Sequence, residues 1–517
     1  MRKILLLLTL LCVCSDLFSQ SWIYRTGPDT LKNRSYYAYL WIPETAAKGI
    51  RGMILAPQIS SEWQFVHNPA IRKAAEKEKL AIIYFNPSRV SVLNAADTTY
   101  LLEVLNRFAE MSGYREIKYA PWFTFGHSTG CLFAMYMAYW KPERTIGVIC
   151  YKGGIVPNPA WFGGSINNIP VSGVQGEYEE YDNTAEVNAT DHSAVALRKD
   201  VLRYRSASTD KNFFSATLLP GEGHMLWSEA GVNIIAEFIS KAAKYRIPEE
   251  AIATNGPVKL RNLNLDDGWA SKGDPHTNID KVIIGPIRAM TSKDSCYWFF
   301  DEEFARHWLA LQQDTRKERQ FVSSPDMPPV IYPAPYSPIA FVSNGKIYET
   351  RVLTDARFTV TAKSSSGLPV DISYQTGSAV FRNDTFSINP ADIADDMTIR
   401  VGLRQNGNTH YKVADRLIKV RLSKYDGKPQ TISFLPVRNI LHPGKKVKIE
   451  AVSTSGLPVT LSLNSGPGQL HGNMLYVKPF TSKTGKTAVI IRAGQEGNRA
   501  FATAQPIELT IEVVNGR

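Results

Sequence analysis

A serine lies between two glycines in the pentapeptide Gly126-His127-Ser128-Thr129-Gly130, which has the spacing G-x-S-x-G. The apolar run 122–125 directly precedes it, and the helix-like segment 131–140 directly follows it. A sharp turn from a strand into a helix lifts the Ser128 hydroxyl above a sheet edge and leaves no room for side chains at the glycines. The helix that begins there offers the Thr129 N–H and its positive dipole end to a developing oxyanion. The motif therefore predicts a nucleophilic serine with one oxyanion donor beside it.

A serine hydroxyl is a weak nucleophile by itself, so the chain must also provide a base. Among the histidines, His224 has the most suitable position, because it follows the strand-like run 213–219 and the tight loop 220–223. A loop that leaves a strand of a parallel sheet delivers its side chains to the edge where the serine lies. His192 is the rival, but no strand-like run precedes it. We therefore favour His224 as the base.

A histidine base needs a carboxylate that orients its ring. The strand-like run 169–174 opens into Gln175-Gly176-Glu177-Tyr178-Glu179-Glu180, which supplies three carboxylates within four positions. A glutamate in a loop is more often a solvated charge than a catalytic group. The residue types alone therefore leave Glu177, Glu179 and Glu180 open as the acid.

The segments around these residues have the rhythm of an α/β domain from residue 35 to about 248. The run 36–42 alternates like an exposed edge strand, whereas the other runs are continuously apolar, as in strands buried on both faces. These buried runs are 52–56, 81–85, 121–125, 146–150, 170–174 and 213–219, and helix-like segments such as 98–111 and 234–243 lie between them. The serine, the acid candidates and the histidine follow three of these runs, so one sheet edge should carry them all.

The chain order of serine, acid and histidine, each after a strand-like run, resembles the α/β-hydrolase superfamily over residues 22–248. Within it, the chain looks closest to secreted serine esterases that act on polysaccharides or polyesters. Two flanking motifs carry that likeness: Ser112-Gly113-Tyr114 ahead of the serine motif, and Tyr151-Lys152-Gly153-Gly154 after the next strand. The resemblance implies a mostly parallel, doubly wound sheet. It also implies an acid three residues past the glycine that ends the strand, which selects Glu179, with Glu177 next.

The loop after the third strand departs from the family pattern. Many family esterases carry His-Gly or His-Gly-Gly-Gly there, whereas this chain reads Ala56-Pro57-Gln58-Ile59-Ser60. The resemblance then places the second oxyanion N–H at Gln58 or Ile59. Three aromatic residues in loops near the proposed acid and base either line a substrate pocket or simply pack, and the sequence leaves both interpretations open: Trp161, Phe162 and Trp227.

The last third of the chain consists of short alternating strand-like segments and Gly/Asn turns. The segments 366–370 (SGLPV) and 405–408 (QNGN) recur at 455–459 and, as QEGN, at 495–498, about 90 residues later. Both halves resemble bacterial Ig-like repeats, whose sandwiches contain about 100 residues. We therefore expect an α/β-hydrolase domain at 21–250, followed by tandem all-β Ig-like sandwiches at 335–425 and 426–517. The aromatic-rich region 251–334 is predicted to pack on the α/β domain as an appendage, with a Pro-rich spacer at 325–338.

Residues 1–20 have the pattern of a secretory signal peptide. Two basic residues precede the apolar run 4–13, and small and polar residues follow it. This run is shorter than the roughly 20 residues of a membrane-spanning helix, and no other run in the sequence comes close. The two cysteines of this segment, Cys12 and Cys14, follow Leu11 and Val13, whereas lipid attachment usually needs a small residue there. We therefore favour cleavage after Ser19 or Gln20. We expect an exported protein that is periplasmic, bound to the cell surface or secreted.

The composition narrows the function classes. With 44% hydrophobic and 21% charged residues among 517, the chain is neither disordered nor fibrous. Its 59 basic and 48 acidic residues are spread without blocks of one sign, so the net charge of +11 does not indicate a nucleic-acid partner. Beyond the signal segment the cysteines are Cys131, Cys150 and Cys296, which can form at most one disulfide and have no metal-ligand spacing. We predict no metal and no cofactor.

These features predict an exported serine hydrolase that cleaves carboxylic esters. The resemblance implies an ester substrate attached to a polysaccharide. A serine peptidase on the same fold is the first alternative, because the triad does not distinguish an amide from an ester. The second alternative is a non-catalytic surface or glycan-binding protein, in which the repeats bind and the α/β domain is a scaffold.

Overall fold

The computed structural model describes residues 22–90, 94–158, 162–179, 193–249, 251–254, 256–324, 350–353, 357–377, 379–383, 385–392, 398–422 and 425–515. The proposed signal peptide and the Pro-rich spacer lie outside these residues. Within them, no helix combines the length and the apolar character that a membrane crossing requires.

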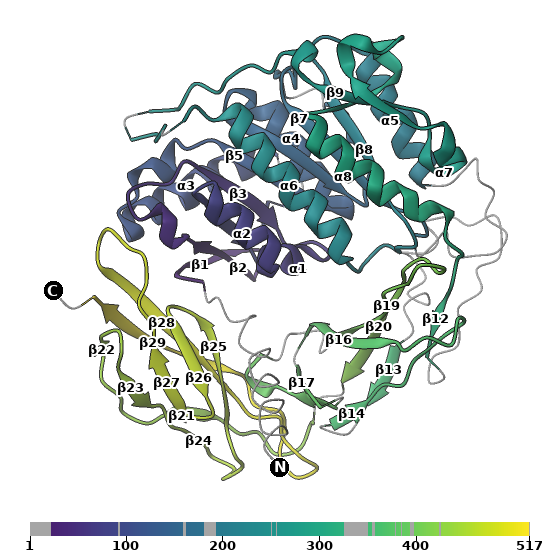
Figure 1. Cartoon of the computed structure of the whole chain (residues 1–517). Coiled ribbons are helices and arrows are strands. Elements are labelled where there is room, and N and C mark those ends of the chain that lie inside the picture. The colour runs from purple at the N-terminus through teal and green to yellow at the C-terminus, as the bar shows by residue number, and fades with distance from the viewer. Residues whose placement is uncertain are drawn as a thin grey trace, which may run out of the picture.

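The N-terminal part of the chain, residues 22–249, is an α/β domain built on one sheet of eight strands (Figure 1). The strand order is β1-β2-β4-β3-β5-β6-β7-β8, and all strands from β3 to β8 are parallel. The strands are β1 Tyr24–Leu31, β2 Arg34–Trp41, β3 Gly52–Pro57, β4 Leu80–Phe85, β5 Trp122–His127, β6 Thr145–Tyr151, β7 Pro170–Gly176 and β8 Phe213–Leu219. This order, with a mostly parallel sheet, defines an α/β-hydrolase fold, which confirms the predicted class.

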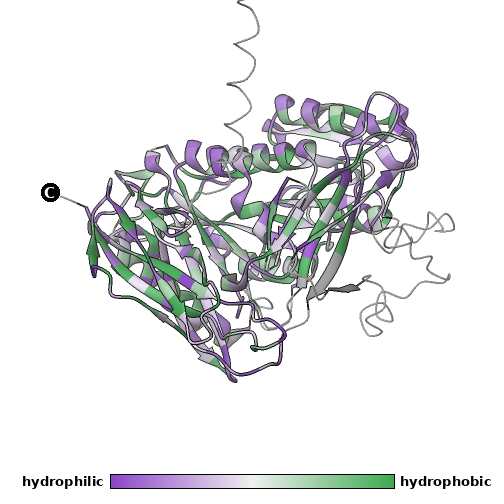
Figure 2. Ribbon diagram, turned by 90° about the horizontal axis from the view of Figure 1, so that it is seen from below, coloured by the Kyte–Doolittle hydropathy of each residue, from purple (hydrophilic) through white to green (hydrophobic). Residues whose placement is uncertain are grey.

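Helices cover both faces of this sheet. They are α1 Glu62–His67, α2 Pro69–Lys77, α3 Ala95–Ser112, α4 Cys131–Trp140, α5 Ser193–Ala207 and α6 Glu229–Arg246. Hydrophobic and hydrophilic residues alternate along the helices in Figure 2, as expected for helices that bury one side against a sheet and turn the other to solvent. Most sheet strands are buried along their whole length, which is why their sequences are continuously apolar.

The predicted edge strand at 36–42 corresponds to β2, which is not at the edge. Strand β1 pairs with it on one side and β4 on the other, both antiparallel. The sequence of β1, YRTGPDTL, is polar and contains a Gly-Pro pair, so it gives no strand signal. The expected edge position of β2 is therefore wrong, because β1 is the edge strand and its sequence does not predict a strand.

The appendage, residues 251–317, covers the other edge of the sheet. It contains a small sheet of β10 Ile283–Pro286, β9 Trp269–Lys272 and β11 Tyr297–Phe299, together with α7 Pro275–Asn278 and α8 Glu302–Gln312. Helix α8 packs on both α6 and β8. The side-chain nitrogens of Trp308 and Gln312 each donate to a carbonyl of edge strand β8, those of Ala216 and Leu218, at 2.9 Å. Both side chains are fully buried.

Two β-sandwiches follow, each with a four-stranded sheet facing a three-stranded one. In the first β-sandwich, residues 318–422, the sheets are β13-β20-β19-β16 and β14-β18-β17. In the second, residues 425–515, they are β22-β29-β28-β25 and β23-β27-β26. The first begins before the expected boundary at 335, because β12 (Val322–Ser323) pairs with β15 (Lys363–Ser364).

The remaining strands complete the two sandwiches. Those of the first are β13 Thr350–Leu353, β14 Arg357–Thr359, β16 Asp371–Thr376, β17 Ala379–Arg382, β18 Thr385–Ile388, β19 Thr398–Gln405 and β20 Ala414–Leu422. Those of the second are β21 Ile432–Phe434, β22 Ile440–Leu441, β23 Lys446–Lys448, β24 Ala451–Ser453, β25 Thr460–Ser465, β26 Gly468–His471, β27 Met474–Val477, β28 Lys486–Gly494 and β29 Ile507–Val514.

In Figure 1 the two sandwiches lie below the α/β domain, and each of these three parts contacts the other two. The second β-sandwich reaches the first strand of the chain, where Arg25 forms a two-pronged ion pair with Glu508. The two sandwiches contact each other where Gly494 of the second packs against Pro390 of the first. The carbonyl oxygen of Pro390 is so close that a Cβ added to Gly494 would lie 2.0 Å from it. The first β-sandwich packs on loops of the α/β domain that follow β7 and β8.

Candidate active site

Ser128 lies in a strained turn at the end of β5. Its φ is +56°, a left-handed conformation that a serine rarely adopts. A Cβ on Gly126 would lie 1.9 Å from the carbonyl oxygen of Gly130, and a Cβ on Gly153 would lie 2.1 Å from that of Ser128. The glycines therefore permit the sharp turn that the G-x-S-x-G motif predicts. Ser128 is half-buried, and Thr129 is exposed beside it.

Glu179 and His224 meet beyond the carboxyl ends of β7 and β8. A Glu179 oxygen, Oε2, is hydrogen-bonded to Nδ1 of His224. The other oxygen, Oε1, accepts from the Gln175 side chain at 2.6 Å and from the Gly176 N–H at 3.0 Å. Because an ionised carboxylate only accepts, Nδ1 of His224 carries the proton, and Nε2 is the ring nitrogen left to act as a base. Both residues are buried, Glu179 completely.

The other candidates are placed elsewhere. Glu177 is buried, but its Oε1 pairs with Lys412 of the first β-sandwich at 2.7 Å, and its Oε2 accepts from the Gly221 N–H at 2.9 Å. Burial by itself raises the pKa of Glu177, but His276 and Lys412 together bring that pKa below its usual value. Glu180 and His192 lie outside the described residues. Among the described hydrogen bonds none joins Ser128 Oγ to the His224 ring, but the ring of His127, the residue before Ser128, lies with its centroid 4.9 Å from that of His224.

The loop expected to supply the second oxyanion donor uses its amides internally. The Gln58 N–H donates to the carbonyl of Phe85 at 2.8 Å, and the Ile59 N–H donates to Glu62 Oε2 at 2.9 Å. The next amide, of Ser60, donates to the same Glu62 oxygen at 2.7 Å. In this structure the Gln58 amide is therefore held by a neighbouring strand, and the Ile59 and Ser60 amides by a carboxylate that no sequence motif singled out.

Glu62 joins this loop to the serine turn. Its other oxygen, Oε1, accepts from the His127 N–H at 2.9 Å, and a Cβ on Gly130 would lie 2.6 Å from it. The side chain is fully buried, and burial raises its pKa to about 7 despite the three N–H donors. No local motif marks this role, because the partners of Glu62 are backbone groups brought together by the fold.

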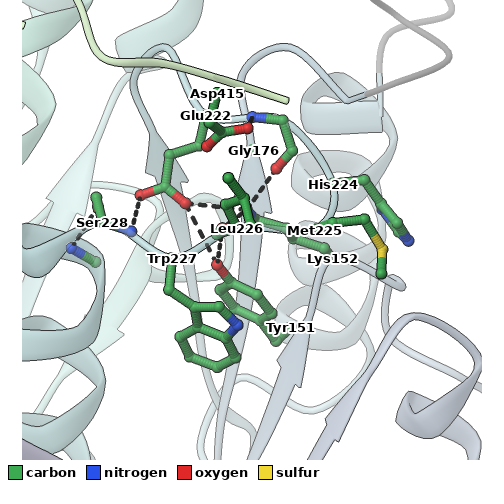
Figure 3. A network of polar contacts seen from close by, with 12 residues as sticks. Tyr151, Lys152, Gly176, Glu222, His224, Met225, Leu226, Trp227, Ser228 and Asp415 are labelled. Atoms are coloured by element: carbon green, nitrogen blue, oxygen red, sulfur yellow. Dashed lines mark hydrogen bonds and ion pairs between the residues drawn. The ribbon is translucent and has the colours of Figure 1, made fainter. Parts of the chain in front are cut away.

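The segment 220–228, which we call the histidine loop, is hydrogen-bonded to the buried side chain of Lys152 (Figure 3). The ammonium group of Lys152 donates to Glu222 Oε2 at 2.9 Å, to the Leu226 carbonyl at 2.8 Å and to the Gly223 carbonyl. Burial by itself raises the pKa of Glu222, but the charges of Lys152 and Arg404 bring it below its usual value. The His127 ring also donates from Nε2 to the His224 carbonyl at 2.8 Å. The loop is therefore fixed on both sides of His224.

The aromatic residues near the site are packed. Trp227 stacks on Tyr151 with ring centroids 3.9 Å apart, and its indole N–H donates to Ser61 Oγ at 2.9 Å. Phe162 is buried against Tyr136. Trp161 lies outside the described residues. For Trp227 and Phe162 the packing interpretation fits these contacts.

The cysteines and possible metal ligands do not form a centre in the described part of the chain. Cys131, Cys150 and Cys296 are buried free thiols. The residues that the structure describes contain no group of three or more His, Cys, Asp or Glu side chains that could hold a metal ion.

Comparison with known proteins gives structural likeness only. No family model matches the chain, and no curated protein matches it in sequence. Among solved structures, it is similar to S-formylglutathione hydrolase from Staphylococcus aureus, with 13% identity and a TM-score of 0.28, covering 41% of this chain and 94% of that one. Est1E from Butyrivibrio proteoclasticus has 14% identity, a TM-score of 0.27 and coverages of 43% and 96%. The siderophore hydrolase EstA from Aspergillus nidulans has 14% identity, a TM-score of 0.29 and coverages of 43% and 92%.

Proposed function

We propose that this protein is an exported serine hydrolase that cleaves carboxylic esters, with substrates attached to a polysaccharide or a related polymer. The observation that carries the proposal is a buried carboxylate paired with a histidine at the carboxyl ends of the parallel strands, the sheet edge where Ser128 also lies. Ser128 lies in a strained strand-to-helix turn, and the His224 ring is hydrogen-bonded through Nδ1 to the buried carboxylate of Glu179. Export rests on the charged and apolar pattern of residues 1–20, and the polymer on the sequence resemblance alone.

In the proposed reaction, Ser128 Oγ attacks the ester carbonyl while Nε2 of His224 takes the hydroxyl proton. Glu179 stabilises the imidazolium that forms and keeps the ring in its orientation. The Thr129 N–H and the dipole of the following helix hold the negative oxygen. The imidazolium then gives its proton to the departing alcohol, which leaves an acyl group on Ser128. Water, deprotonated by His224, releases the carboxylic acid and restores the serine.

The second oxyanion donor requires a small change of the loop after β3. The Ile59 N–H reaches a substrate oxygen only if it leaves Glu62 Oε2, to which it now donates. We place this donor at Ile59, with Gln58 as the alternative, and a substrate-bound structure would distinguish the two.

The test is reaction of residues 21–517 with a fluorophosphonate, which labels an activated serine without needing the natural substrate. We expect rapid labelling of the parent, none in Ser128→Ala and at least about a 1,000-fold slower reaction in His224→Ala, because losing the histidine of a triad costs about 10⁶-fold in kcat. A folded parent that stays unlabelled would refute the catalytic assignment and turn attention to glycan binding by the full chain. With a labelled parent, matched ester and amide substrates then decide between an esterase and a peptidase.

A further inference from the structure

The first β-sandwich makes a close contact with the loops that carry the proposed acid and base. The contact is made by residues 411–415, which we call the docking segment; it comprises the end of the β19–β20 loop and the first two residues of β20. Gly221 has a φ of +79°, and a Cβ there would lie 2.0 Å from the carbonyl oxygen of Val413. A Cβ on Gly223 would lie 2.9 Å from Oδ1 of Asp415. The histidine loop therefore fits the docking segment so tightly that Gly221 could not carry a side chain, and one at Gly223 would have to displace the Asp415 carboxylate.

Lys412 supplies the first polar anchor. Its ammonium group pairs with Glu177 Oε1 at 2.7 Å, and the two side chains are only 6% and 4% exposed. The other oxygen of Glu177 accepts from the Gly221 N–H at 2.9 Å. Glu177 directly follows β7 and lies two residues before Glu179. Its carboxylate thus connects this segment to the histidine loop and to the first β-sandwich.

Asp415 supplies the second anchor, on the residue next to the base. Its Oδ1 accepts from the Gly223 N–H at 3.1 Å, and its Oδ2 accepts from the guanidinium group of Arg404 at 3.1 Å. The Asp415 side chain is 2% exposed. Lys152 of the α/β domain holds the Gly223 carbonyl, so this peptide segment is fixed from both domains immediately before His224.

The second β-sandwich provides an internal comparison, because it repeats the same local structure. The side-chain nitrogen of Gln320 donates to Gln405 Oε1 and to the Lys412 carbonyl, and that of Gln430 donates to Gln495 Oε1 and to the Ala502 carbonyl. Ala502 therefore occupies the position of Lys412. Beyond this point the strand registers of the two sandwiches differ by one residue, and the uncharged Gln505 and Pro506 lie where the first sandwich has Asp415. A sandwich of this type forms without either charge, so the two charges in the first sandwich serve its contact with the loops.

The first β-sandwich also reaches the opposite side of the serine turn. The ring of Tyr374, on β16, lies edge-on to that of Trp63, with centroids 6.3 Å apart. The backbone N–H of Trp63 donates to Oε1 of Gln58, a residue of the loop after β3, at 2.9 Å. Figure 1 shows β16 next to α1, and β19 and β20 below the α/β domain.

We propose that the first β-sandwich is a component of the active site, in which Lys412 and Asp415 are positioning residues that hold the Glu179 and His224 loops in register with Ser128. This inference rests on the proposed function. Catalysis by a triad depends on the separations of its groups, and a displacement of about 1 Å costs about 100-fold in rate. Without Lys412, the buried carboxylate of Glu177 would lose its nearest cation and keep only the ring of His276, 3.8 Å from Oε1. The chain around Glu179 would then move to let water reach this carboxylate.

The test removes both charges, with Lys412→Ala and Asp415→Gln together, in the full chain. We expect the fluorophosphonate labelling rate to fall about 10- to 100-fold. We also expect the midpoint of its pH dependence to move to lower pH, because a loosened Glu179 carboxylate favours the protonated imidazole less. Lys412→Arg keeps the charge and should restore most of the rate. Lys363→Ala, which removes an exposed lysine of the same sandwich, should leave rate and midpoint unchanged.

The outcomes separate the two proposals. No labelling of the folded parent refutes the proposed function. A labelled parent with an unchanged rate and midpoint in the folded double variant overturns the positioning role alone. If the double variant does not fold, Lys412→Met alone is measured below its melting temperature against the same two criteria, and a parental rate and midpoint there also overturn the role.

Discussion

Replacing Lys152 by methionine should destabilise the α/β domain strongly. The side chains of Lys152 and Glu222 are 0% and 1% exposed, and the ammonium group also holds two carbonyls of the histidine loop. Methionine has a similar length but no charge, so the Glu222 carboxylate would stay buried without its cation. Breaking a buried ion pair from one side costs about 3–5 kcal/mol.

An exposed pair of the same type gives the matched control. Lys141 and Glu143 are 3.9 Å apart and 38% and 59% exposed, so Lys141→Met should cost about 0–1 kcal/mol. For a domain of this size, 1 kcal/mol corresponds to about 2–4 °C in Tm. Thermal melting should therefore fall by roughly 6–20 °C in Lys152→Met and by less than about 4 °C in Lys141→Met.

A double-mutant cycle shows whether the pair itself is responsible. Glu222→Gln in the Lys152→Met background removes the stranded charge, so the double variant should lose less than the sum of the two single variants. Equal losses in Lys152→Met and Lys141→Met, or a loss under about 1 kcal/mol in the former, would show that burial does not strengthen this pair as we argue.

Three further predictions concern the groups around Ser128. Glu179→Gln should lower kcat for an ester about 10⁴-fold, because an amide can donate to His224 and stabilise the wrong tautomer; a loss under tenfold would argue against this acid. Burial raises the pKa of Glu62 to about 7, above its usual value near 4.5, so the folded protein keeps a proton that the unfolded chain releases. The urea midpoint should therefore fall from pH 5 to pH 8, with a smaller fall in Glu62→Gln; identical slopes would contradict this pKa. Gly153→Ala should cost about 1–3 kcal/mol in urea unfolding, whereas Gly163→Ala, whose Cβ would meet nothing within 4 Å, should be neutral.

Local patterns were sufficient to predict every strand of the eight-stranded sheet except β1. Runs such as 81–85 and 213–219 are apolar because both faces of the strand are buried, and the structure has strands at 80–85 and 213–219. The chain positions of Glu179 and His224, each just past a parallel strand, explain why they meet. Glu179 itself was selected by family resemblance, because its sequence context offers three carboxylates equally.

The contacts that support the site could not be predicted in this way. Glu62 accepts from Ser60 nearby but also from the His127 amide, and Lys412 pairs with a glutamate more than 200 residues earlier. Such pairs depend on how distant segments pack, and they leave no periodic trace in the sequence. The contact of the Ile59 amide with Glu62 could not be predicted for the same reason, so the second oxyanion donor, at Ile59 or Gln58, stays a prediction.

The capping of strand β8 by Trp308 and Gln312 affects how the protein behaves in solution. An uncovered edge strand exposes a row of carbonyls and amides to which another chain can add as a further strand. The two side chains occupy alternate carbonyls of this edge, at Ala216 and Leu218, and α8 covers them. The cap comes from residues more than 80 positions later in the chain. A truncated form ending before α8 would therefore carry an apolar, hydrogen-bonding edge that invites self-association, so the appendage protects the sheet against aggregation.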